Sequence, residues 1–491
     1  MKKESNLKRN NISFILDNIY ISIKSMWYLI FLFLSGLKEN PIIAISIFTV
    51  IFILFPIYGW IVKKFEVKEK SIIYSVGLIN KRIIEIPFDK VTTIDIKKNI
   101  IDRIFKVVTL KIDSGAILNV GQEIKLKLKA KEGYEIRNLI NNSVIKDIDN
   151  ENSEVNETNI DINNIMKKVS FKDICIYTLS KSKLLFLITS FFLVSEFISN
   201  IDEISNFGIM KKIENEISFE WINSVDLLKL ILLAIGIYIV LYIFINIIYT
   251  LFEWVKLYDF TLYKGDNDIK IKYGLLTVKE YSIPKDKIYA IILKQSFILQ
   301  LINKYSIEVI TSGYGDEQNE QALIYPIASK EFINNELSKI IPELIISEEG
   351  SKPSKKVLDR FIVFRSIILI AFILPIFILL PNDILILKLL VSLILIIYNI
   401  ILGYINYKNT SLFINKDIII SSSGNIKKLT TIVKQEFLEG IEIRDNMFLR
   451  RRNICHYKFH IYRTAISITN LVKVKNMDKD LIKDIEENLV L

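Results

Sequence analysis

Few side chains in this sequence are candidates for catalysis or for metal binding. His456 and His460, the two histidines of the sequence, follow Cys455 in the segment CHYKFHIYR. Aromatic and polar residues alternate there, which predicts a strand, and no third ligand stands at a suitable spacing for a metal ion. The sequence contains no glycine-rich phosphate loop and no Gly-x-Ser-x-Gly nucleophile elbow. We therefore predict no catalytic residue, no metal and no cofactor, and we expect a protein that is not an enzyme.

Clusters of lysine are the second group of candidate site residues. Lys125, Lys127 and Lys129 alternate with leucines, so a strand there would present three ammonium groups on one face. Lys97 and Lys98 form another basic pair. Each exposed cation near an anionic membrane contributes on the order of 1 kcal/mol, so we predict that these lysines bind anionic lipid. An ordinary solvated surface is the alternative for any one cluster.

Long apolar runs alternate with polar blocks along the 491 residues. Three runs carry no charge: 41–62, 230–252 and 389–407. Each is long enough to cross roughly 30 Å of hydrocarbon. A weaker apolar run precedes each one, at 19–37, 184–201 and 366–382. The sequence thus predicts six transmembrane helices in three hairpins.

The distribution of charge predicts the orientation of these hairpins. Basic residues gather in the first ten positions, whereas the segment 202–226 between two spans is acidic. Because positive residues stay on the cytoplasmic side, we expect the N-terminus and every polar block there. The formal net charge of +10 fits soluble parts that lie on an anionic inner leaflet. No compact block is strongly basic, so we do not expect nucleic acid as a partner.

One block of sequence occurs three times, each time after a charge-free apolar run. The copies span 74–96, 271–293 and 421–443 and align without gaps. Their shared positions, which we take as structural, are Gly77, Gly274 and Gly424, then Pro87 and Pro284 with Lys434, then Asp89, Asp286 and Glu436. The repeating unit consists of an apolar anchor followed by a soluble block, and its three copies indicate triplication of one ancestral unit. Such a triplication favours a scaffold or binding protein over an enzyme.

Each polar block is predicted to begin with strands and to end with a helix. β-Branched and aromatic runs broken by glycine or polar turns indicate the strands. The closing helices are expected at 130–142, 329–341 and 478–491, the second with Ser329 as its N-cap. Such a helix covers the open face of a curved antiparallel sheet. The fold class is therefore an α+β membrane protein.

The order of these motifs resembles a known family. An apolar hairpin is followed by Tyr-x-x-Gly-Leu and Ile-Pro-x-Asp-Lys, and then by NIIDRIF or SFILQLINKY. This arrangement is similar to the bacterial pleckstrin-homology-like (PH-like) domains of the YdbS/YdbT membrane proteins, and three copies match the longer YdbT type. The resemblance is good in the first two repeats and poorer in the third. It implies a partly open seven-stranded barrel capped by one helix, a bacterial inner-membrane location, and a role in envelope maintenance or in resistance to membrane-active peptides.

These predictions divide the chain into alternating anchors and modules. The segments are 1–64 (tail and hairpin 1), 65–142 (PH-like domain 1), 143–168 (linker), 169–255 (hairpin 2), 256–342 (PH-like domain 2), 343–360 (linker), 361–407 (hairpin 3) and 408–491 (PH-like domain 3). We expect a scaffold or lipid-surface protein whose partners are membrane lipids and either a second copy or another membrane protein of the same family. A transporter or lipid-handling protein is one alternative, which would require Glu196 and Arg365 buried together. A membrane-surface enzyme is the other and would need a pocket of clustered carboxylates.

Overall fold

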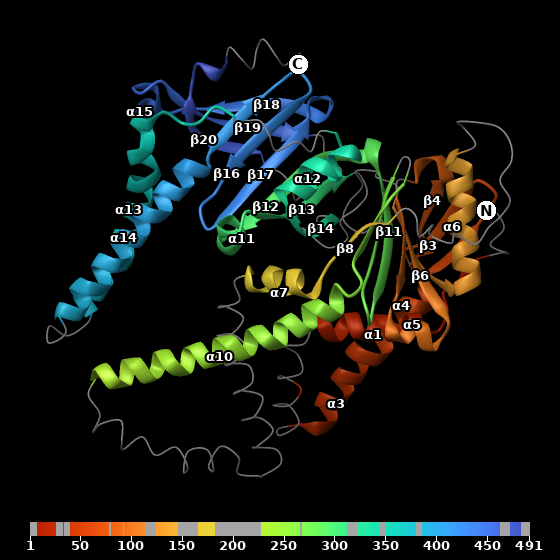
Figure 1. Ribbon diagram of the computed structural model, residues 1–491. Helices are drawn as coiled ribbons and strands as arrows, with labels where there is room; N and C mark the ends of the chain where they lie inside the picture. The colour runs from red at the N-terminus through yellow and green to blue at the C-terminus, as the bar shows by residue number, and fades with distance from the viewer. Residues whose placement is uncertain are drawn as a thin grey trace.

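The computed structural model is an α+β protein in which three modules of antiparallel strands stand next to long helices (Figure 1). It describes residues 7–25, 33, 40–77, 80–91, 93–113, 124–145, 165–181, 227–265, 268–311, 322–342, 350–379, 385–461 and 472–482. We number the modules 1 to 3 along the chain.

Module 1 contains two sheets and a closing helix. Its strands are β1 (Lys8–Arg9), β2 (Lys64–Val67), β3 (Ser71–Val76), β4 (Arg82–Pro87), β5 (Thr93–Lys98), β6 (Val107–Asp113) and β7 (Ile124–Lys129). Its helices are α1 (Phe14–Ser25), α3 (Pro41–Thr49), the π-helix η1 (Val50–Leu54), α4 (Phe55–Val62), the 3-10 turn η2 (Phe88–Lys90), α5 (Ile100–Ile104) and α6 (Ala130–Ile145).

Module 2 repeats this order. Its strands are β8 (Ile165–Lys168), β9 (Thr261–Lys264), β10 (Asp268–Tyr273), β11 (Val278–Pro284), β12 (Ile288–Ser296), β13 (Lys304–Thr311) and β14 (Ala322–Ser329). Its helices are α7 (Phe171–Leu179), α10 (Leu227–Lys256), η5 (Lys285–Lys287), α11 (Phe297–Leu301), α12 (Lys330–Asn335) and η6 (Leu337–Lys339).

Module 3 follows the same plan. Its strands are β15 (Ser411–Ile414), β16 (Ile418–Ser423), β17 (Lys427–Lys434), β18 (Leu438–Arg444), β19 (Ile454–Ile461) and β20 (Lys473–Asp478). Its helices are η7 (Lys355–Val357), α13 (Leu358–Leu379), α14 (Leu385–Asn409), η9 (Gln435–Phe437) and α15 (Met447–Arg450).

The first sheet of each module includes residues that precede the predicted hairpin in the sequence. β1 pairs with β2 and β8 pairs with β9, while Ser351 forms a bridge with Leu412 in module 3. Each module therefore extends beyond the segment expected from sequence, which begins after the hairpin. Modules 1 and 2 then contain the seven strands that the resemblance implies, β1 to β7 and β8 to β14.

Sheets continue from one module into the next. The second sheet of module 1 joins the first sheet of module 2 in the order β7-β6-β5-β11-β10-β9-β8, and β14-β13-β12-β17-β16-β15 joins modules 2 and 3 in the same way. We call the β5–β11 contact seam 1 and the β12–β17 contact seam 2. The modules are thus not separate barrels, because neighbouring modules share a sheet.

The two seams differ in length and polarity. Seam 1 has three paired positions, from Val278 opposite Lys98 to Glu280 opposite Ile96. Seam 2 has seven, from Ala290 opposite Val433 to Ser296 opposite Lys427. β12 is buried along Ile288 to Leu293, and its residues contribute to the cores of both adjoining modules. Apolar burial therefore joins modules 2 and 3 more strongly than modules 1 and 2.

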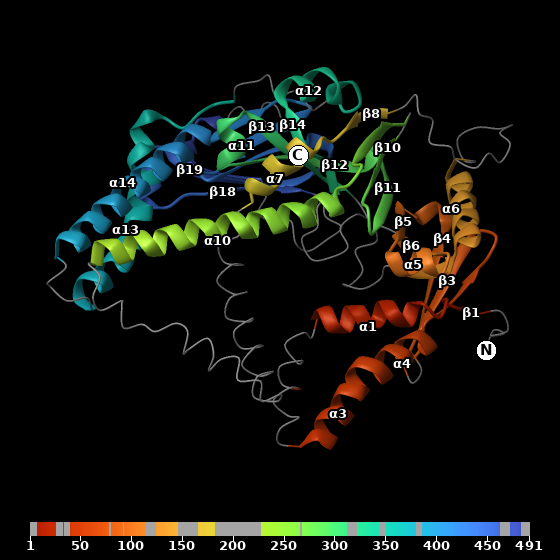
Figure 2. The ribbon, with the colours of Figure 1, turned by 60° about the horizontal axis from the view of Figure 1, so that its bottom comes forward.

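Two helical stretches in the described part of the chain are long and apolar enough to cross a membrane. They are Pro41–Val62, which comprises α3, η1 and α4, and Lys388–Asn409 within α14. α10 and α13 are continuous helices of 30 and 22 residues. In both views the far ends of α3, α10 and α14 point away from the sheets on one side of the molecule (Figures 1 and 2). The expected six spans stay a prediction, because 184–201 and most of 19–37 lie outside the described residues.

The closing helices follow the sequence prediction in two modules. α6 begins at Ala130 as expected. Ser329 caps α12 by accepting a hydrogen bond from the Phe332 backbone N–H at 3.2 Å, although α12 is shorter than predicted and is followed by η6. The predicted helix at 478–491 lies mostly outside the described residues. Its first residue, Asp478, ends β20.

Candidate functional site

The predicted row of three exposed lysines on β7 is wrong at its centre. Ile124, Leu126 and Leu128 face the core, as the alternation predicts, and Lys125 and Lys129 are exposed. Lys127, however, is 0% exposed. The N-terminal segment covers its side of the strand, and that segment lies more than a hundred residues away in sequence. Lys127 therefore cannot bind a lipid headgroup at the surface.

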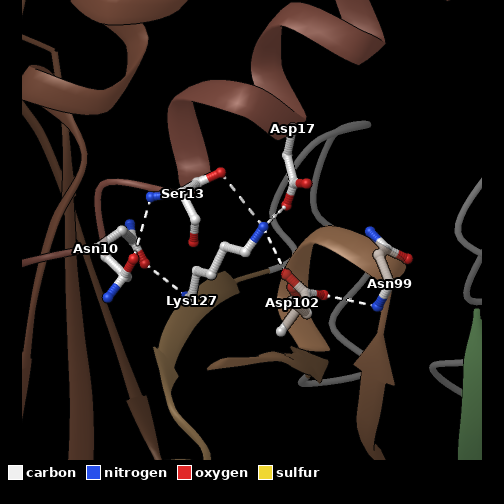
Figure 3. A network of polar contacts seen from close by, with 8 residues as sticks. Asn10, Ser13, Asp17, Asn99, Asp102 and Lys127 are labelled. Carbon is white, nitrogen blue, oxygen red and sulfur yellow. Dashed lines mark hydrogen bonds and ion pairs between the residues drawn. The ribbon is translucent and has the colours of Figure 1, made fainter. Parts of the chain in front are cut away.

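Lys127 instead joins the N-terminal segment to module 1. Its Nζ lies 2.6 Å from Asp102 Oδ1 and 2.5 Å from Asp17 Oδ2. Its backbone N–H donates to Asn10 Oδ1 at 2.7 Å, and its carbonyl accepts from the Asn11 N–H at 2.9 Å. Figure 3 shows Lys127 between α1, which carries Asp17, and the turn that carries Asp102. The segment that leads into hairpin 1 is thereby fixed on the module.

A charged contact of the same kind occurs in the other two modules. In module 2, Asp173 of α7 pairs with Lys304 at 2.9 Å. In module 3, Asp359 of α13 pairs with Arg452 at 2.7 Å. Burial would raise the pKa of Asp173, but hydrogen bonds from Lys304 and Ser170 lower it overall. Each of the helices α1, α7 and α13 thus carries an acid in its first turns that pairs with a base of its own module.

Lys97 and Lys98 lie at seam 1. Lys97 is exposed and pairs in register with Lys279, while Lys98 pairs with Val278. The Lys98 ammonium also lies 4.9 Å from the centroid of the Tyr134 ring. Beside them, Arg137 of α6 crosses the seam to Glu280 at 3.0 Å. Whether Lys97, Lys98, Lys125 and Lys129 bind anionic lipid stays a prediction.

The repeated glycines occupy turns that require glycine. Gly77, Gly274 and Gly424 have φ values of 96°, 111° and 125°. A Cβ at Gly274 would lie 2.0 Å from the Thr277 carbonyl oxygen. In module 2 the glycine turn contacts the end of α10, because the Leu275 N–H donates to the Val255 carbonyl. In module 3 it contacts the end of α14, because the Gly424 N–H donates to Asn406 Oδ1. In modules 2 and 3 the glycine turns therefore lie where the chain enters the module from its helix.

The other shared positions form the crossing between the two sheets of a module. Pro87, Pro284 and Lys434 each precede a 3-10 turn, and Asp89, Asp286 and Glu436 are its middle residues. The chain leaves one sheet before this turn and enters the other after it. These shared positions therefore form the turn that connects the two sheets of each module.

A repeated apolar surface was not predicted from the sequence. The one-turn helices α5, α11 and α15, which we call the turn helices, expose large apolar side chains: Ile100, Ile104 and Phe105, then Phe297, Ile298, Leu301 and Ile302, then Met447 and Phe448. Asn99, Ser296 and Asn446 stand at their N-caps, and Lys106, Asn303 and Asn453 follow with positive φ. These cap and turn positions recur at the spacing of the glycines, which is the signal that could have found them.

Each turn helix lies beside a hairpin segment. Asp102 of α5 reaches α1 through Lys127. Gln300 of α11 accepts from Asn409 at the end of α14, with 2.9 Å between the atoms. Leu449 of α15 packs with Phe361 and Tyr407 of hairpin 3 and with Val357 of the η7 turn before it. Exposed apolar side chains beside apolar helices of this kind are suited to the bilayer interface.

The two histidines lie on a strand, as predicted. β19 carries both, with His456 Nδ1 accepting from the Asn476 N–H at 3.0 Å and His460 Nε2 lying 3.3 Å from Glu442. Within the described residues, no group of three or more His, Cys, Asp or Glu side chains is placed to hold a metal ion.

Comparison with known proteins agrees with this architecture. The sequence model described as Bacterial PH domain matches residues 22–144 and 217–339, which together make up half of the chain. The transmembrane protein YdbT of Bacillus subtilis (strain 168) is 22% identical over 456 residues, which cover 91% of this chain and 87% of that relative. No solved structure was found to match. The repeated modules, their position beside membrane-length helices and these matches show that the chain belongs to the bacterial PH domain family of YdbT-like membrane proteins.

Proposed function

We propose that this protein is a non-enzymatic scaffold of the bacterial inner membrane. In this proposal six spans in three hairpins hold the N-terminus and the three modules on the cytoplasmic side. The modules bind the lipid surface and present a continuous array of sheets to a protein partner. The supporting observation is that all three modules repeat an exposed apolar turn helix beside a hairpin segment. In the cell, such a scaffold would serve envelope maintenance or resistance to membrane-active peptides.

The turn helices supply enough apolar surface for this role. Transfer of one exposed Leu, Ile or Phe side chain from water into an apolar environment is favourable by about 1.5–3 kcal/mol. Leu301 and Ile104 are each 71% exposed and Phe448 is 65% exposed, so much of that free energy is still available. Exposed Arg103, Lys106 and Arg451 flank these residues and would face anionic headgroups.

The alternatives have less support. A transporter would need ionisable groups paired at membrane depth. Arg365 lies in α13, and Glu196 lies outside the described residues. An enzyme would need a pocket of clustered carboxylates. Asp417, Glu436 and Glu439 line one pocket, but Lys416 and Lys434 line it with them and offset their charge. Neither the family description nor the name of the relative is that of an enzyme.

The depth of the turn helices in the bilayer tests the proposal. Cys175 and Cys455 are first replaced by Ala, and single cysteines are then placed at Ile104, Leu301 and Phe448 of the full chain in anionic proteoliposomes. A polarity-sensitive fluorophore at these sites should emit at shorter wavelength than in detergent and resist quenching by iodide. The matched control is Leu139→Cys, because Leu139 is 55% exposed on α6, away from the hairpins in both views. Equal iodide quenching at Leu301 and Leu139 would rule out the membrane-facing role.

A further inference from the structure

The two seams within the chain use the same strands in the same register. Counted from the aligned glycines, Lys97 and Lys294 occupy one position, and Lys279 and Leu429 occupy another. Seam 1 pairs Lys97 with Lys279, and seam 2 pairs Lys294 with Leu429. The seam is therefore a reproducible interface between the second sheet of one module and the first sheet of the next.

Module 1 and module 3 each contain a strand that corresponds to one half of this interface. β18 is the module 3 counterpart of β5 and β12, and β4 is the module 1 counterpart of β11 and β17. Among the described strands, β4 is the last in the order β1-β2-β3-β4 and β18 is the first in the order β18-β19-β20. An outermost strand presents backbone N–H and C=O groups that can pair with another strand.

These two strands cannot pair with each other within one chain. β4 and β18 lie well apart, with elements of module 2 between them in both views (Figures 1 and 2). A strand supplied by another molecule can meet either one.

We propose that β18 of one copy pairs antiparallel with β4 of a second copy in the register of the two internal seams. This assembly is heterologous, because different surfaces of the two copies meet, and it can extend or close into a ring. It deepens the scaffold role proposed above by naming a second copy of this chain as the partner.

The transferred register brings suitable residues together. The seam 1 pair of Ile96 and Glu280 corresponds to Ile443 opposite Ile83. Both isoleucines are exposed in the single chain, Ile443 by 40% and Ile83 by 60%. The seam 1 pair of Lys98 and Val278 corresponds to Asp445 opposite Lys81, which have opposite charges, and Asp445 also pairs with Arg450 and Lys479 of its own module. Arg444 would stand opposite Arg82, and Glu442, which already pairs with Arg444, offsets part of that repulsion.

This assembly allows the hairpins of all copies to enter the same membrane. The internal seams join modules while the far ends of their helices stay on one side (Figures 1 and 2). The same pairing between copies repeats that relation, so all hairpins of the assembly would enter one bilayer. Confinement to a membrane also raises the effective concentration of the partner strand.

Disulfide trapping between full chains tests the register. In the background without Cys175 and Cys455, one tagged chain carries Ile83→Cys and a differently tagged chain carries Ile443→Cys, and both are reconstituted in one set of liposomes. Directly opposite residues of antiparallel strands have Cα atoms about 4.5–5.5 Å apart, which is within disulfide range. Oxidation should give a mixed dimer at least fivefold more abundant than the control pair Ile83→Cys with Glu439→Cys. Glu439 is exposed on the same strand but lies about 13 Å along it.

An internal control shows whether the seam geometry permits a disulfide at all. Ile96→Cys with Glu280→Cys places the same pair of positions within one chain, and it should form an intrachain disulfide. If that bond forms and the mixed dimer does not exceed the Glu439→Cys control, the proposal is wrong. Because the liposomes contain only this protein, the test does not depend on how deeply the turn helices lie in the bilayer.

Replacing the two isoleucines by residues of opposite charge gives a second test of the pairing, in which the number of chains per assembly is measured. Ile83→Lys should abolish assembly of otherwise unchanged chains, and mixing these chains with Ile443→Asp chains should restore it, as counted by stepwise photobleaching in liposomes. Restoration by Ile443→Asp but not by Ile443→Lys supports the pairing. Assembly that persists in Ile83→Lys alone contradicts it.

Discussion

Asp102 and Lys127 form a fully buried ion pair at positions where module 2 carries the buried residues Leu299 and Ile327. The aligned glycines relate Asp102 to Leu299, and the ends of β7 and β14 relate Lys127 to Ile327. One module therefore uses charge, and its neighbour uses apolar packing, in the same place. The charged version also reaches Asp17 of α1, which a leucine could not bind.

The Lys127→Met substitution should destabilise the protein by about 3–5 kcal/mol, because it leaves the Asp102 carboxylate buried and unpaired. Asp102→Leu combined with Lys127→Met should lie within about 2 kcal/mol of the wild type, because Asp17 is partly exposed and can be hydrated. Denaturant titrations of the four proteins in a double-mutant cycle give the coupling free energy. Trp60, which donates to the Asn10 carbonyl at 2.8 Å, reports locally on the same contact.

The matched control for this cycle is the exposed bridge of module 3. Asp359 and Arg452 are each almost half exposed, so Asp359→Asn should cost less than about 1 kcal/mol. A loss at Asp359 as large as that at Lys127 would show that burial does not decide the strength of these contacts.

Gly274→Ala should destabilise module 2 by about 1–3 kcal/mol, because an L residue is strained at a φ of 111° and the new Cβ would clash with the Thr277 carbonyl. Gly440→Ala is the control, since a Cβ there meets nothing within 4 Å. Thermal unfolding of both variants in detergent measures the difference. Equal losses at the two glycines would contradict the structural role of the repeat signature.

Local patterns in the sequence predicted much of the fold. The inward-facing Ile124, Leu126 and Leu128 of β7 and the Ser329 cap depend on neighbouring residues, and both are confirmed. The repeated glycines have the positive φ values that favour glycine. The burial of Lys127 could not be predicted, because Asn10 and Asp17 cover it from the far end of the chain. The same holds for the seams, since nothing within β12 indicates that its partner is β17 of the next repeat. The turn helices were missed because a single helical turn is too short to show a hydrophobic period.

Seam 1 should open before seam 2, because it has fewer paired positions and depends on polar contacts. Backbone amides at 278–280 should exchange with solvent at least tenfold faster than those at 290–296, as measured by hydrogen–deuterium exchange with mass spectrometry. Arg137→Ala should speed exchange at 278–280 further, because it removes the bridge to Glu280. The control is Lys8→Ala, which removes an exposed bridge to Glu132 on α6, the helix that also carries Arg137. It should leave exchange at both seams unchanged. Faster exchange at seam 2 than at seam 1 would contradict this order.

Module 3 should lose stability as the pH falls below about 6.5. Burial lowers the pKa of His456, and the neutral ring accepts the Asn476 N–H through Nδ1. The unfolded chain therefore binds a proton at His456 more readily than the folded module does. The contribution of the neutral ring is complete above the unfolded pKa, near 6.5, and is lost as the pH falls toward the folded value. Thermal unfolding between pH 8 and pH 5 should show this loss in the wild type and a smaller one in His456→Asn. The same pH slope in both proteins would show that the ring does not couple to folding.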